Sequence, residues 1–133
     1  MNYFAIPGVP RQDLKKLPAI LVADKLWKII ALRSGIKAEM FKSKLNFNGG
    51  AIKRRQRLKV YYRKMFYYIM RVYTDSKFIW LAGYMEQDHT TVIYAVQSFK
   101  DFIEIGETAP TEESISVEKD CMEVVEILRG SFK

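Results

Sequence analysis

The chain has 133 residues, of which 49% are hydrophobic, and a formal net charge of +7. This composition is typical of one folded domain with tails and excludes a disordered chain. The most apolar stretch, residues 60–73, is shorter than the roughly 18 residues of a membrane span and contains basic side chains. Cys121 is the sole cysteine, and the N-terminus does not resemble a signal peptide. We therefore expect a cytoplasmic protein without an internal disulfide.

The positive charge is concentrated in one block. Residues 42–77 contain eleven Lys or Arg and one acidic residue, whereas residues 78–133 contain four Lys or Arg and eleven acidic residues. In most proteins a run of charge only solvates a helix face. A block this dense is more typical of proteins that bind a polyanion, so we favour nucleic acid as the partner.

The first half of the chain predicts an irregular arm followed by helices. Residues 1–18 contain three prolines and read as the arm. Apolar spacing predicts a helix over residues 19–33, which Ser34-Gly35 would end. Residues 37–43 are expected to add one or two helical turns. The sequence LNFNGG at 45–50 indicates a loop, and its glycine spacing does not match a phosphate-binding loop.

A basic run, KRRQRLK at residues 53–59, leads into a long predicted helix. Helical spacing predicts that one stripe faces the core, namely Leu58, Tyr62, Met65, Ile69 and Val72. A second stripe is expected to face outward, namely Arg63, Lys64, Tyr67 and Arg71. Tyr61, Tyr67 and Tyr68 are considered as an interface, although packing roles are favoured for most of them.

A short apolar helix over residues 77–85 precedes a tight turn and another helix. Asp88 is a good N-cap for that second helix. Its inward stripe is predicted to be Val92, Val96, Phe99 and Phe102 or Ile103, with His89, Thr90, Thr91 and Tyr94 exposed.

Two short helices joined by a tight turn predict a helix-turn-helix. In that motif the second helix enters the major groove, where Asp, His and Thr side chains can form hydrogen bonds with the edges of the bases. The alternative is an N-cap followed by polar residues without a function.

The last part of the chain is acidic. Residues 106–114 are predicted to be a linker and residues 115–133 to hold an amphipathic C-terminal helix, outside a main domain that spans residues 19–105. Such an acidic segment could fold back on the basic block and compete with nucleic acid. We would then expect deletion of residues 107–133 to tighten binding.

The segment DHTTVIYAV, residues 88–96, is similar to the RDHTTVxHA signature of the DNA-binding C-terminal domain of the bacterial replication initiator DnaA. KRRQRLKVYYRKMFYYIMRVYTDS and KIIALRSGIKAEMFKSK resemble neighbouring segments of that domain, so the resemblance covers roughly residues 20–105. It implies a small all-α domain with a Trp-repressor-like helix-turn-helix, to which this chain adds a C-terminal helix. The chain departs from the family where Met85-Glu86-Gln87 replaces Gly-Gly-Arg and Tyr94 replaces His. Because these residues contain no phosphate-binding loop, we expect a free-standing domain without the ATPase module of the full-length initiators.

The resemblance implies roles for individual residues. Arg55, within a loop at residues 53–57, would enter the minor groove of an A/T-rich box, and Asp88, His89 and Thr90 would contact bases in the major groove. Arg63, Lys64 and Thr91 would contact phosphates. We expect further phosphate contacts from the rest of the basic run, namely Lys53, Arg54, Arg57 and Lys59.

The predicted function is sequence-specific binding of double-stranded DNA, in replication initiation or its regulation. A transcriptional repressor with the same fold stays open, as does a protein-interaction module that docks on the replication machinery. An enzyme is not expected, because one His and one Cys do not supply a zinc site and the adjacent Asp88 and His89 side chains point apart. No cofactor, metal or membrane partner is expected, and the oligomeric state is open.

Overall fold

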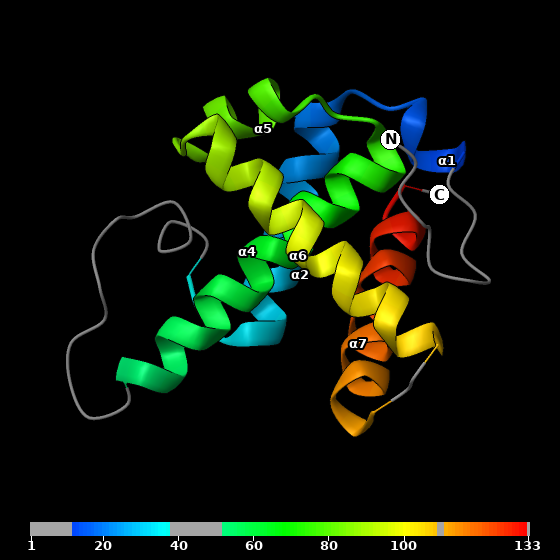
Figure 1. Ribbon diagram of the computed structural model, residues 1–133. Helices are drawn as coiled ribbons and strands as arrows, with labels where there is room; N and C mark the ends of the chain where they lie inside the picture. The colour runs from blue at the N-terminus through cyan, green and yellow to red at the C-terminus, as the bar shows by residue number, and fades with distance from the viewer. Residues whose placement is uncertain (1–11, 38–51, 109–110, 133) are drawn as a thin grey trace.

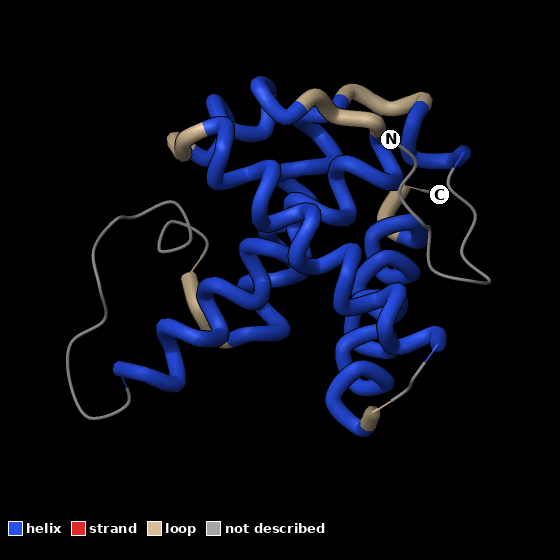
Figure 2. Tube along the Cα trace, viewed as in Figure 1, coloured by secondary structure: helices blue, strands red, loops and turns tan. Residues whose placement is uncertain are grey.

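The computed structural model describes residues 12–37, 52–108 and 111–132, and in residues 52–57 it describes the backbone alone. Within these ranges every regular element is a helix (Figure 2). The helices are α1 (Gln12–Lys15), α2 (Ala19–Ser34), α4 (Ile52–Thr74), α5 (Phe78–Met85), α6 (His89–Thr108) and α7 (Glu112–Gly130). The predicted all-α fold class is therefore confirmed. No helix in the described ranges is long and apolar enough to cross a membrane.

Local signals set the ends of α2 as the sequence predicts. The carbonyl of Pro18 accepts hydrogen bonds from the N–H groups of Leu21 and Val22, at 3.1 and 3.3 Å, and so begins the helix. Gly35 ends it with φ of 74° and donates its N–H to Ala31. This left-handed conformation suits glycine, which has no Cβ to clash. The extra turns predicted at 37–43 and the predicted loop at 45–50 fall almost entirely outside the described residues.

The end of the predicted arm contains a short helix, because residues 12–15 form α1. Leu14 is buried against the core, and Lys15 Nζ lies 2.7 Å from Asp75 Oδ2 beyond the end of α4. One buried leucine and one ion pair therefore attach the end of the arm to α4.

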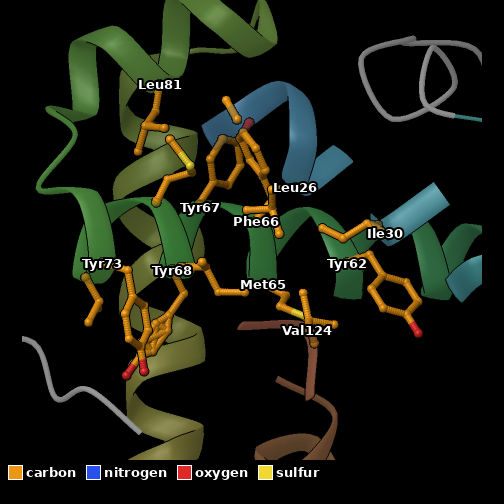
Figure 3. Close-up of a cluster of buried hydrophobic side chains, with 14 of the residues drawn as sticks. Leu26, Ile30, Tyr62, Met65, Phe66, Tyr67, Tyr68, Tyr73, Leu81 and Val124 are labelled. Atoms are coloured by element: carbon orange, nitrogen blue, oxygen red, sulfur yellow. The ribbon is translucent and has the colours of Figure 1, made fainter. Parts of the chain in front are cut away.

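Helix α4 runs through the centre of the fold, with α2, α6 and α1 packed against it (Figure 1). Its residues 65–70 are all buried, so the middle of this helix is covered on every side. Figure 3 shows α4 side chains among Leu26 of α2, Leu81 of α5 and Val124 of α7. The predicted inward stripe is confirmed, with Leu58 only partly buried. The predicted outward position of Tyr67 is wrong, since its side chain is fully buried.

Aromatic rings join three helices to α4. Phe66 stacks on Trp27 of α2 with ring centroids 4.4 Å apart, and its other neighbour is Tyr84 of α5 at 5.8 Å. Tyr68 meets the edge of Phe99 of α6 at 5.0 Å. These contacts use the tyrosines and phenylalanines of α4 for packing, so the positions of α5 and α6 depend on α4.

Helix α7, which was predicted to follow the main domain, packs against α2 and α6 and shares their core. Its buried side chains are Cys121, Val124, Val125 and Leu128. Helix α6 continues to Thr108 and α7 begins at Glu112, so most of the predicted linker at 106–114 is helical. The sequence signal was misleading because an acidic segment can be solvated on one helix face while the other face is buried.

Acidic residues of α7 pair with the end of α2. Asp120 and Glu123 both accept hydrogen bonds from the guanidinium of Arg33, and Asp120 also accepts one from the Tyr61 hydroxyl at 2.8 Å. Deleting residues 107–133 would remove this cluster and the buried side chains beside it. Such a deletion would therefore test folding, and it cannot test whether the acidic segment competes with DNA.

Candidate nucleic-acid interface

The turn between α5 and α6 determines where α6 begins. Glu86 adopts φ of 53° and ψ of 42°, and its N–H donates to the carbonyl of Gly83. The N–H of Gln87 donates to the carbonyl of Ala82 at 2.9 Å. This pair of bonds is the Schellman motif, which turns the chain sharply after a helix. The carbonyl of Asp88 then accepts the N–H of Val92 at 3.2 Å, so Asp88 occupies the predicted N-cap position.

The packing of α6 leaves its first turn open to solvent. Val92, Val96, Phe99 and Ile103 are buried against the rest of the core, as predicted. Asp88, His89, Thr90, Thr91 and Tyr94 are exposed, and Tyr94 is 71% exposed. The prediction that His89 lies on the surface and outside the core is therefore confirmed. The polar side chains that were expected to read or flank bases in the major groove are therefore all exposed around the start of α6.

The basic run does not form the predicted loop. Residues 53–57 are the first turns of α4, whose backbone is helical from Ile52 onward. Nothing from residue 52 to 74 breaks a helix, and the glycines that suggested a loop lie upstream at 49 and 50. The side chains of Lys53, Arg54, Arg55 and Arg57 lie outside the described part, so their contacts stay a prediction. In Figure 1 the start of α4 and the start of α6 do not adjoin.

The next basic residues along α4 differ in accessibility. Lys59 is only 2% exposed, and burial lowers the pKa of its ammonium group, helped by the positive charge of Arg63. Arg63 is half-buried, and burial lowers its pKa as well. A covered ammonium cannot reach a phosphate, so the structure gives no support to Lys59 as a phosphate contact.

Lys64 of α4 contacts α6 directly. Its Nζ donates a hydrogen bond to Oγ of Ser98 at 3.3 Å. Ser98 is exposed and lies one helical turn beyond Tyr94 on the same side of α6. Sequence reasoning missed Ser98, although its spacing from Thr91 and Tyr94 could have indicated it. The exposed face of α6 thus continues from the polar first turn to a cation supplied by α4.

Two of the three tyrosines considered as an interface are not on the surface. Tyr67 and Tyr68 are at most 1% exposed, and Tyr61 is partly buried with its hydroxyl bonded to Asp120. The favoured packing roles of Tyr67 and Tyr68 are therefore confirmed, and neither side chain can form an interface. Among the described residues no group of His, Cys, Asp or Glu has an arrangement that could hold a metal ion.

Comparison of the chain with protein-family models, with curated proteins and with solved structures found no match. Membership of the initiator family therefore stays a prediction that rests on the resemblance of residues 88–96 and the segments before it.

Proposed function

We propose that the protein binds double-stranded DNA sequence-specifically, with the first turn of α6 in the major groove. The observation that carries the proposal is the exposure of His89, Thr90 and Thr91 on a helix whose opposite side is buried. A helix anchored in this way can insert its N-terminal end into a groove without losing core contacts. Imidazole and hydroxyl groups can bond base edges, and the threonine methyl can touch the thymine methyl.

The electrostatics of the chain support the same proposal. Eleven Lys or Arg against one acidic residue in residues 42–77 place a strong positive charge in the sequence segment that contains α4. Lys64 extends this charge to the exposed side of α6 through Ser98. Phosphate contacts from such residues supply affinity without sequence information, whereas His89 and Thr90 would supply the choice of site.

The resemblance of residues 88–96 to the initiator signature favours a role in replication initiation or its regulation. A transcriptional repressor would use the same DNA contacts at a different location, so the site that the protein selects separates these two roles. Selection of bound sequences from a random duplex pool would provide that site. Selection of no sequence at all, with no retention on heparin at moderate salt, would instead favour the protein-interaction module.

The selected duplex then allows a test of individual residues by fluorescence anisotropy. We expect His89→Ala to weaken binding to the selected site by about 1–3 kcal/mol and to change binding to random duplex little. Lys64→Ala should weaken both duplexes alike, because a phosphate contact is the same in each. Lys119→Ala on the exposed side of α7 is the matched control and should change neither.

Salt dependence tests the electrostatic part separately. If roughly six phosphates are neutralised, the logarithm of the association constant should fall with the logarithm of salt concentration with a slope near −5. Lys64→Ala should make this slope shallower by about 1. Equal losses on both duplexes for His89→Ala would show that this side chain does not read bases, and binding independent of salt would contradict the proposal.

A further inference from the structure

The outward face of α2 carries apolar side chains at both ends and opposite charges between them. Ile20 is 49% exposed, Leu21 53% and Leu32 87%. Asp24 and Lys28 are exposed between them. Single exposed apolar residues are common on monomers. Here Ile20, Asp24, Lys28 and Leu32 recur every four residues and so form one row along the helix. A row with apolar ends and opposite charges between them can pair with a row of complementary order.

We propose that this face binds the same face of a second copy of the chain, with the two α2 helices antiparallel. In a pair related by a two-fold axis near the middle of α2, Ile20 of one copy lies opposite Leu32 of the other, and Asp24 lies opposite Lys28. Each of these pairs occurs twice, as a two-fold interface requires. The order along α2 is apolar, acidic, basic and apolar. Two copies of this row therefore place apolar against apolar and acidic against basic positions only when the helices are antiparallel.

The acidic group on this face is held in place. Oδ1 of Asp24 accepts a hydrogen bond from the Tyr84 hydroxyl at 2.6 Å, which orients the carboxylate at the surface. Lys28 is exposed one turn further along, and Lys25 lies half-buried at the edge of the face. Like charges in a parallel pairing would meet at positions 24 and 28, so the charges select the antiparallel orientation.

Helix α7 offers another exposed apolar pair, Ile115 at 56% and Ile127 at 49%. It fits a second copy less well, because the exposed Glu112 and Glu126 outnumber the exposed Lys119 on this side. Glu123 is already bonded to Arg33 within the same chain. Two α7 helices would therefore gain less from pairing than two α2 helices, on which the exposed Asp24 and Lys28 balance each other.

A two-fold dimer would also extend the proposed function. It would present two copies of the α6 first turn, and such dimers read two half-sites in DNA. The dimer itself does not depend on DNA binding. Its test below uses the protein alone, so failure of one proposal is distinguishable from failure of the other.

Sedimentation velocity of the full chain over about a hundredfold range of concentration tests the proposal. We expect a shift from monomer to dimer as concentration rises. Leu32→Glu should weaken this association by about tenfold or more, because each copy would place a carboxylate against apolar side chains. The position is so exposed that the thermal unfolding midpoint should not change. Ile115→Glu makes the same substitution on α7 and should leave association unchanged.

The charge pair gives a second test. Lys28→Asp alone and Asp24→Lys alone should each weaken association, since each places like charges opposite one another. A mixture of the two variants should associate more tightly than either alone, because a mixed dimer again has opposite charges at both positions. A chain that stays monomeric, equal losses for Leu32→Glu and Ile115→Glu, or a mixture no tighter than its components would overturn the proposal.

Discussion

Replacing Tyr67 with phenylalanine tests whether the buried hydroxyl of this side chain destabilises the fold. The Tyr67 side chain is fully buried, and its hydroxyl has no hydrogen-bond partner among the described residues. Burial raises the pKa of this hydroxyl, while the nearby positive charge of Arg63 acts in the opposite direction. A buried hydroxyl without a partner loses its bonds to water on folding, which costs about 1–3 kcal/mol.

Tyr67→Phe removes that cost and keeps the ring. It loses only the weak attraction between the hydroxyl dipole and Arg63, so we expect a net gain of about 1 kcal/mol in the free energy of unfolding. For a chain of this size the gain corresponds to a rise of about 3–5 °C in the unfolding midpoint. The expected gain comes from the hydroxyl, because the ring is the same in both side chains. The matched control is therefore a tyrosine whose hydroxyl has a hydrogen-bond partner.

Tyr61 provides that control on the same helix. Its hydroxyl donates to Oδ2 of Asp120 at 2.8 Å, so Tyr61→Phe should lower the free energy of unfolding by about 1–3 kcal/mol. Urea unfolding followed by circular dichroism measures both variants. If Tyr67→Phe lost as much stability as Tyr61→Phe, the Tyr67 hydroxyl would have a partner in solution and the reasoning would be wrong.

Three further changes test the fold. Glu86→Gly should raise the free energy of unfolding by about 1 kcal/mol in urea, since Glu86 has φ of 53°; a loss would show that its side chain offsets the strain. Leu128→Ala should cost about 2–5 kcal/mol within one cooperative transition, and a separate early transition of α7 would contradict a shared core. Burial raises the pKa of the Cys121 thiol, so the folded state keeps a proton that the unfolded thiol releases above a pKa of about 8.5. The free energy of unfolding should therefore fall as pH rises above about 8.5, by up to about 1.4 kcal/mol per pH unit. Cys121→Ala should make this fall less steep below about pH 10. A slope that the substitution leaves unchanged would show that other groups cause the fall.

The polar first turn of α6 was predictable because its signals are local. Asp88 precedes a helix whose apolar residues recur every three or four positions, and that spacing places His89 and Thr90 on the opposite side. The exposure of these two side chains follows as long as the core covers only the apolar side of α6. The contact between Lys64 and Ser98 was not predictable, because it depends on how α4 lies across α6.

The sequence by itself determined the all-helical class, the ends of α2 and the exposure of the first turn of α6. These follow from interactions within one or two turns of the chain, such as the left-handed Gly35 and the start of α6 after Asp88. Only the tertiary structure decided that Tyr67 and Lys59 are buried and that α7 completes the core. Helical spacing predicts which residues share a face of a helix. How many of those faces are buried depends on the other helices that pack against it.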